Sequence, residues 1–194
     1  KVYGEETYKK NFFNEKYIPS PKQEYSKSKY TAEQELLKRL KKSSINLTII
    51  RPPMIFGKTP NGNLKILIKA IKNNIPIPIS KIPNQRSFLG LENLCLFIEN
   101  ILIKKIASNL IYNVSDGLPI STKELTNAIG LAINKKVRYL FIPDMILEIL
   151  LKLPLISTMF KPLFKDFVIK SLSESHIKKK ILLVSTKKLI QKNY

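Results

Sequence analysis

Cysteine and histidine are nearly missing from this sequence, which limits the chemistry that it can perform. The 194 residues include one cysteine, Cys95, and one histidine, His176. A single cysteine excludes an intrachain disulfide, and a lone histidine without cysteine partners predicts no metal site. Cys95 lies in the apolar run LENLCLFIENIL, where we expect it to be a small buried core residue.

The sequence also shows no long hydrophobic run and no signal-peptide pattern at its first residues. No apolar run reaches the roughly 18 residues that a transmembrane helix needs, and no signal peptide opens the chain. We therefore expect a cytoplasmic protein. Asp144–Phe164 is apolar enough for a helix on a membrane surface, but packing against its own domain or a dimer partner is the favoured interpretation.

Acidic residues are scarce: 14 of them face 34 basic residues, for a net charge of +20. Such an excess could attract nucleic acid or anionic lipid. However, 30 of the basic residues are lysines, only 4 are arginines, and they are spread along the whole chain. Arginine is the usual choice for bidentate contacts with phosphates and bases. We interpret the lysines as a compositional bias and expect no nucleic-acid partner; a non-enzymatic module that binds nucleic acid or membrane remains the alternative from another class.

The overall amino-acid composition is typical of a globular protein. Hydrophobic residues make up 44% of the chain and the mean hydropathy is −0.08, which suits one ordinary domain or two small ones. A helix is expected to begin with Ser20 as N-cap and Pro21 in its first turn. The β-branched run Leu47–Ile50 predicts a buried parallel strand, and the loop RPPMIFG follows it. Helix, strand and loop in this order form half of a doubly wound α/β unit, in which ligands bind at the carboxyl ends of the strands.

The rest of the chain continues to alternate. After Gly57 we expect a helix in NGNLKILIKAIKNN, an extended IPIPIS segment, a strand or loop in NQRSFLG and a helix in LENLCLFIENILIKK. The segment NLIYNVSDG predicts a strand, and Ser121 with Glu124 forms a capping box that opens the next helix. A strand in KKVRYLFIP and a short last helix in VSTKKLIQK complete an α/β chain.

Tyr25 and Lys29 lie four positions apart in the expected first helix. Chance alone gives about one Y-x-x-x-K pair in a chain this rich in lysine, so the spacing carries weight only through its context. The two residues share a helix face with Ala32, Leu36 and Leu40, which predicts that they point toward the body of the protein. Burying an ammonium costs several kcal/mol unless it is paired, so we expect Lys29 to have a partner or ligand.

The order of these motifs resembles the extended short-chain dehydrogenase/reductase family. VYGE, Y-x-x-x-K on a helix, RPPMIFG after a strand, NQRSFLGLENLCLFI and YNVSDGLPISTKEL follow one another as in NAD-dependent sugar-nucleotide epimerases and dehydratases. The likeness is greatest to UDP-glucose and UDP-N-acetylglucosamine 4-epimerases of bacterial surface-polysaccharide clusters. It implies the C-terminal part of a Rossmann-type doubly wound parallel sheet, together with a smaller α/β substrate-binding domain.

The resemblance also implies domain boundaries. Residues 1–57 would be the C-terminal remainder of the NAD-binding domain, and residues 58–194 would be mainly the substrate-binding domain, with 86–116 returning to the Rossmann sheet. The family's glycine-rich turn and its Ser or Thr before the VYG segment would precede Lys1, so we expect further sequence upstream. Glu24 and Met54 depart from the family pattern, and Met54 replaces a substrate-binding Asn of some epimerases.

The reaction that the resemblance implies runs through a 4-keto sugar. Tyr25 would remove the proton of the sugar's 4-hydroxyl while bound NAD accepts a hydride from C4, and both would then return to give the opposite epimer. The ammonium of Lys29, one turn away, would favour the phenolate of Tyr25, and the resemblance implies that it also binds the nicotinamide ribose.

Four further residues take roles from the same resemblance. Pro52 would line the nicotinamide pocket, Asn63 and Arg86 would bind the substrate diphosphate, and Ile79 would border the uracil base. A homodimer through the helix that carries Tyr25 is also implied. Related reactions stay open as alternatives, namely a 4,6-dehydratase, a 4-keto-reductase or an epimerase of polyprenyl-linked sugars, and so does an inactive remnant.

Overall fold

The computed structural model of the chain describes the larger part of its 194 residues. The described residues are 2–4, 6–7, 12–60, 62–79, 84–104, 110–143, 145–146, 149, 152, 164–170 and 185–194. His176 and most of Asp144–Phe164 lie outside them, so the expectations for these residues stay predictions.

Helices and short strands alternate along the described chain. Its helices are α1 (Glu24–Leu40), α2 (Gly62–Lys72), α3 (Leu91–Lys104), α4 (Thr122–Ala132) and α8 (Thr186–Asn193). Its strands are β1 (Thr48–Arg51), β2 (Met54–Phe56), β3 (Ile77–Ile79), β4 (Phe88–Gly90), β5 (Leu110–Asn113) and β6 (Tyr139–Phe141).

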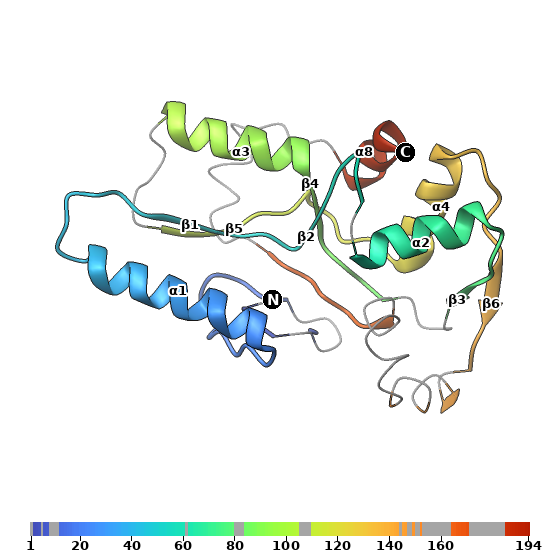
Figure 1. The fold of residues 1–194 in the computed structure, drawn as a ribbon, viewed down its shortest axis with the longest axis horizontal. Helices are drawn as coiled ribbons and strands as arrows, with labels where there is room; N and C mark the ends of the chain where they lie inside the picture. Colours follow the sequence, from blue (N-terminus) through green and yellow to red (C-terminus); the bar gives the residue numbers. More distant parts are fainter. Residues whose placement is uncertain are drawn as a thin grey trace.

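The strands pair in parallel, as expected for an α/β fold. β1 pairs with β5, β2 with β4 and β3 with β6. Helices α1 and α3 lie on opposite sides of the β1–β5 pair. Helices α8, α4 and α2 lie beyond β4, toward β3 and β6 (Figure 1). Parallel strands with helices on both faces confirm the predicted α/β class.

Two details of the first expected unit are wrong. Helix α1 begins at Glu24 rather than near Ser20, because Gln23 has an extended backbone (φ −87°, ψ 147°) and serves as its N-cap. The stretch predicted as a loop after the prolines contains β2, in which Met54 to Phe56 pair with Phe88 to Gly90. The parallel partner supplies backbone hydrogen bonds that local sequence does not reveal.

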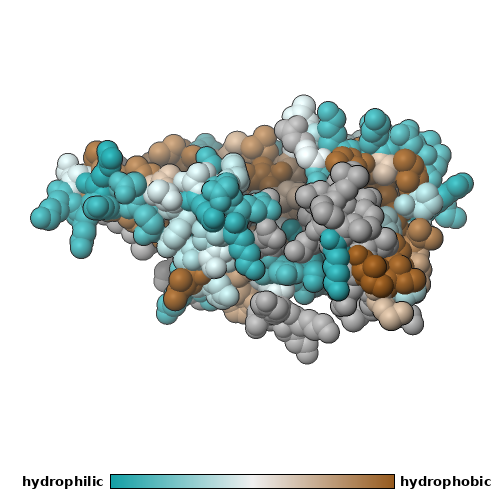
Figure 2. All heavy atoms as spheres, turned by 60° about the horizontal axis from the view of Figure 1, so that its bottom comes forward, coloured by the Kyte–Doolittle hydropathy of each residue, from teal (hydrophilic) through white to brown (hydrophobic). Residues whose placement is uncertain are grey.

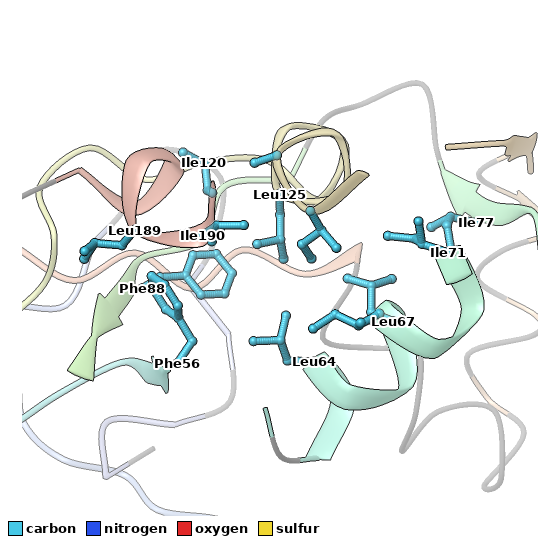
Figure 3. Packing of buried hydrophobic residues seen from close by; sticks show 13 residues of the cluster. Phe56, Leu64, Leu67, Ile71, Ile77, Phe88, Ile120, Leu125, Leu189 and Ile190 are labelled. Carbon is cyan, nitrogen blue, oxygen red and sulfur yellow. The ribbon is translucent and has the colours of Figure 1, made fainter. Parts of the chain in front are cut away.

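The largest hydrophobic cluster lies between α2, α4, α8 and strands β2 and β4 (Figure 3). α8 contributes Leu189 and Ile190, which are 1% and 0% exposed, and Ile190 lies beside Phe88 (Figure 3). Gly90 allows this approach, since a Cβ at that position would lie 2.3 Å from Leu189 Cδ1. The last helix is therefore an integral part of the core.

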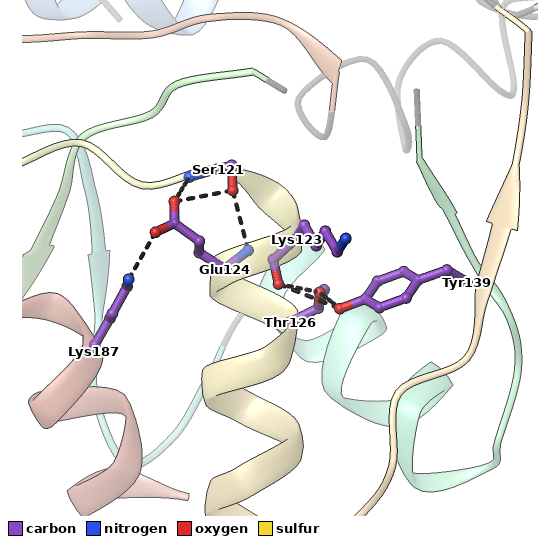
Figure 4. Close-up of polar contacts among 6 residues, drawn as sticks. All are labelled: Ser121, Lys123, Glu124, Thr126, Tyr139 and Lys187. Carbon is purple, nitrogen blue, oxygen red and sulfur yellow. Dashed lines mark hydrogen bonds and ion pairs between the residues drawn. The ribbon is translucent and has the colours of Figure 1, made fainter. Parts of the chain in front are cut away.

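A capping box begins α4, as the sequence predicts. Ser121 Oγ accepts a hydrogen bond from the Glu124 backbone N–H at 3.1 Å, and Glu124 Oε2 accepts one from the Ser121 N–H at 2.9 Å (Figure 4). The same carboxylate pairs with Lys187 of α8 at 2.7 Å. The hydrogen bond from Lys187, with those from Ser121, lowers the pKa of Glu124. Glu124 thus joins the start of α4 to α8.

Helix α3 is held at its start by a carboxylate from the turn after β5. Asp116 accepts hydrogen bonds from the Gly90 N–H at 3.0 Å and from Asn93 Nδ2 at 2.7 Å. An anion at this end of a helix is stabilised by the helix dipole. Farther along, Cys95 is exposed, so its expected burial is wrong. It shares the outward side of α3 with Leu91, Ile98 and Leu102, while Phe97 enters the core.

The two ends of the molecule differ in surface character. Hydrophilic side chains dominate the end that carries α1, and at the opposite end, which carries β3 and β6, hydrophobic side chains lie among hydrophilic ones (Figure 2). The exposed hydrophobics of this second end include Leu140, Phe141, Met145, Ile146 and Ile149. Within the part of the chain that the structure describes, no helix has both the length and the apolar character to span a bilayer.

Candidate functional site

A cleft of about 1030 Å³ runs along α1 and β1. Its walls come from the start of the chain, from α1, from β1 and the prolines after it, and from the segment around Arg86 and 165–169. Five of the six residues predicted as functional line it: Tyr25, Lys29, Pro52, Asn63 and Arg86. The cleft lies beside the carboxyl end of a parallel strand, where open α/β sheets bind their ligands.

Tyr25 and Lys29 face this cleft one helical turn apart. Lys29 Nζ lies 5.6 Å from the centre of the Tyr25 ring, and Lys29 makes no ion pair among the described residues. Tyr25 is 65% exposed and Lys29 is also exposed. Their shared helix face is confirmed, but the expected burial of Lys29 is wrong, because that face borders an open cleft rather than the core. Both polar groups are accessible to a ligand.

Arg86 enters the cleft from a short bridge between segments that are distant in sequence. Its backbone N–H donates to the Ile120 carbonyl at 3.0 Å, and its Nη1 donates to the Lys165 carbonyl at 2.8 Å. The guanidinium also lies over the Phe167 ring at 5.6 Å. Burial lowers the pKa of Arg86 to about 10, with nearby Asp166 acting in the opposite direction. The group stays positive near neutral pH and suits an anionic ligand.

Pro52 and Asn63 are half-buried in the wall of the cleft. Pro52 directly follows the last residue of β1, and Asn63 is in the first turn of α2. Ile79 is not among the residues that line this cleft; it ends β3 and pairs with Phe141 of β6. Its contact with a uracil base therefore rests on the family resemblance alone.

A buried polar network underlies the wall between α1 and β1. Arg51 donates to Glu33 from Nη2 at 2.6 Å and from Nε at 3.0 Å, and to the Tyr3 hydroxyl at 2.9 Å. The Tyr3 hydroxyl in turn donates to Asn113 Oδ1 at 2.9 Å. Burial raises the pKa of Tyr3, although the contacts with Arg51 oppose this.

An aromatic cluster borders the cleft near the N-terminal segment, with Tyr3 and Phe167 among the residues that line it. Tyr3 stacks on Phe13 with ring centres 5.3 Å apart, and Phe13 meets Phe167 edge-on at 5.7 Å. Ile169 bridges to Phe13 and is 3% exposed. Lys165 lines the cleft near Arg86, and its amino group pairs with Glu6 at 3.3 Å. The segment 164–170 thus joins the start of the chain to β4.

Sequence reasoning missed Glu33, Arg51 and Lys165. Two signals were available: Glu33 lies four positions after Lys29 on the same helix face, and Arg51 is one of only four arginines and ends a buried strand. Lys165 carries no comparable signal, because it is one lysine among thirty and reaches the cleft only through tertiary folding. Among the described residues, no group of three or more His, Cys, Asp or Glu side chains could hold a metal ion.

Comparison with known sequences finds a family model and curated relatives that resemble this chain. The family model described as male sterility protein, an NAD-binding family, matches residues 2–75. A UDP-glucose 4-epimerase of Vibrio cholerae is 32% identical over 144 residues, which are 74% of this chain and 44% of the relative. An N-acetyl-alpha-D-glucosaminyl-diphospho-ditrans,octacis-undecaprenol 4-epimerase of Escherichia coli O157:H7 is 30% identical over 132 residues, which are 67% of this chain and 40% of the relative.

Solved structures confirm the fold. The dTDP-glucose 4,6-dehydratase of Bacillus anthracis, determined in complex with NAD, superposes with a TM-score of 0.71 at 17% identity over 99% of this chain and 57% of that one. The predicted Rossmann-type architecture is therefore correct. The chain spans less than half the length of the curated relatives that it matches.

Proposed function

Because the chain belongs to the extended short-chain dehydrogenase/reductase family, we propose that it acts in an NAD-dependent 4-epimerase of UDP-glucose or a UDP-N-acetylhexosamine. The observation that carries this proposal is the Tyr25–Lys29 pair, one turn apart on the side of α1 that lines the cleft. The two curated relatives, both named as 4-epimerases, support the same reaction.

NAD is the cofactor that we propose for this cleft. When bound, it supplies the hydride acceptor and donor for C4 of the sugar. The exposed amino group of Lys29 would hold the nicotinamide ribose, and Pro52 would border the nicotinamide ring. The six glycines of the chain form no G-x-x-G-x-x-G turn, and Lys29 and Pro52 are the residues that we propose for the nicotinamide end of the cofactor.

Tyr25 would carry the proton of the reaction. Its hydroxyl would take the proton of the sugar's 4-hydroxyl and return it after the 4-keto sugar has presented its other face. Lys29 Nζ, 5.6 Å from the centre of the Tyr25 ring, places a positive charge beside this residue. Exposure of Tyr25 to the cleft supports the role, because a general base must reach its substrate within hydrogen-bond distance.

Arg86 and Asn63 would hold the substrate diphosphate. The planar guanidinium of Arg86 suits bidentate phosphate contacts, and it lines the same cleft as Tyr25. Asn63 lies in the first turn of α2, where backbone N–H groups favour an anion. Ile79 stays a prediction for the base contact. A cytoplasmic location and a homodimer through α1 likewise stay predictions.

A polyprenyl-linked sugar is a second candidate substrate. The Escherichia coli relative, 30% identical, is named for such a substrate. The exposed hydrophobics Leu140, Phe141, Met145, Ile146 and Ile149 would suit contact with lipid, and Lys135, Lys136 and Arg138 precede them in sequence. Parallel assays with the UDP-sugar and with the polyprenyl diphosphate sugar separate the two candidates.

Substitution of Tyr25 tests the proposed function. In the full-length protein, Tyr25→Phe is expected to lower kcat for interconversion of the gluco and galacto epimers by roughly 10²- to 10⁴-fold while NAD stays bound, because only the proton-transfer group is removed. Tyr30→Phe on the same helix is the matched control and should keep near-normal activity. Lack of NAD binding or of epimer interconversion in the unsubstituted protein contradicts the proposal.

A further inference from the structure

A buried ion pair joins α1 to the end of β1, one helical turn beyond Lys29. Both N–H contacts from Arg51 converge on one oxygen of Glu33, and the side chains of Arg51 and Glu33 are 6% and 14% exposed. Burial by itself would lower the pKa of Arg51, but the hydrogen bonds to Glu33 and Tyr3 outweigh it and raise the pKa above its usual value. The guanidinium is therefore held in its charged form.

The pair continues into a network that crosses the ends of two strands. Arg51 and Asn113 are the last matched residues of β1 and β5, and the Tyr3 hydroxyl bridges their side chains. The backbone N–H of Asn113 donates to Glu15 Oε1 at 3.0 Å. The guanidinium also lies over the Tyr3 ring at 4.9 Å. The strand ends beside the cleft are thus tied to one helix by directional bonds.

Apolar packing does little to hold α1 in this position. Ser26 is its one buried residue, whereas Leu36 and Leu37 are 45% and 38% exposed. Two N–H bonds to one carboxylate oxygen are directional, so they restrain both the rotation and the height of the helix. Glu33 supplies that restraint eight residues after Tyr25 and four after Lys29, on the same side of the helix.

We propose that Glu33 and Arg51 are positioning residues, whose ion pair sets where Tyr25 and Lys29 stand relative to the end of β1 and Pro52. The inference rests on the proposed function for the roles of Tyr25 and Lys29, but the ion pair and its place do not depend on it. Catalytic groups that are misplaced by about 1 Å can lose roughly 100-fold in rate, so the position of α1 is a determinant of activity.

The test replaces the ion pair by an apolar pair of similar size. In Glu33→Leu/Arg51→Met no buried charge is left alone, so the full-length protein is expected to keep or increase its resistance to urea. Its kcat should nevertheless fall by about 10- to 100-fold with KM little changed. The same substitutions at the exposed pair of α1, Glu35→Leu/Arg39→Met, are the matched control, since those side chains are 52% and 79% exposed. This control should retain full activity.

A second variant keeps the proposal testable if the double variant fails to fold. Glu33→Asp preserves the charge but withdraws the carboxylate by one methylene, and kcat should again fall at constant KM. Normal kcat in a folded double variant, or in Glu33→Asp if the double variant does not fold, overturns the proposal, because a pair that only stabilises the fold would leave the rate unchanged.

Hydrogen exchange separates this proposal from the proposed function. The double variant is expected to lose amide protection in α1 but not in α4, and this readout does not require catalysis. If the unsubstituted protein lacks epimerase activity while α1 still loses protection, the proposed function fails and the positioning role stands. Unchanged protection of α1 in an inactive protein overturns the positioning role as well.

Discussion

Adding one methyl group at Gly90 should destabilise the natural protein but not a variant in which Leu189 is truncated. A Cβ at Gly90 would lie 2.3 Å from Leu189 Cδ1, far inside the contact distance of about 3.5–4.0 Å. Leu189 is 1% exposed and has little room to withdraw, so Gly90→Ala is expected to destabilise the protein by about 1–3 kcal/mol. Leu189→Ala alone should cost about 2–5 kcal/mol through the lost contacts and the cavity.

The two changes together should cost less than their sum. Once Leu189 is truncated, the nearest remaining atom to the new Cβ is Phe56 Cζ at 3.5 Å, an ordinary contact. Gly90→Ala in the Leu189→Ala background should therefore be neutral, or stabilising by up to about 1 kcal/mol because the unfolded chain loses freedom. The free energy of unfolding, measured by urea denaturation for all four proteins, gives the coupling directly.

The control is Lys188→Ala, an exposed change in the same helix that should leave stability nearly unchanged. A similar penalty for Gly90→Ala in both backgrounds would refute the reasoning, because it would show that the cost arises in the backbone of β4 and not from contact with α8. No penalty in the unsubstituted background would show that α8 packs differently in solution.

Two further predictions concern a surface carboxylate and the diphosphate site. The lowered pKa of Glu124 contributes stability that is present above the carboxyl's unfolded pKa and is lost as pH falls through its folded pKa. Glu124→Gln should therefore flatten the acid side of the curve of unfolding free energy against pH. The change should be modest, because the pair with Lys187 is half exposed, and an unchanged curve contradicts the prediction. Arg86→Gln should raise KM for the nucleotide sugar about 10- to 100-fold, because a charge-assisted contact is lost. Lys69→Gln, on the exposed side of α2, is the control and should leave KM unchanged. Equal KM values in the two variants contradict the diphosphate role of Arg86.

Most helices and strands follow from local sequence. The capping box at Ser121 and Glu124 forms as the residue types require, and α2 forms where the sequence predicts an amphipathic helix, with Leu64, Leu67 and Ile68 on its buried side. The predictions are wrong where the structure of a segment depends on contacts with residues distant in sequence. β2 exists because Met54–Phe56 meets β4, and Cys95 is exposed because nothing in the described chain covers that side of α3.

The site divides in the same way. Local sequence by itself determined that Tyr25 and Lys29 share one side of a helix, because a separation of four residues is nearly one helical turn. Only the tertiary structure decided that this side borders an open cleft, that Arg86 reaches the same cleft, and that Glu33 and Arg51 meet beneath it. These contacts depend on strand pairing between residues dozens of positions apart, and the local sequence pattern does not predict which strands pair.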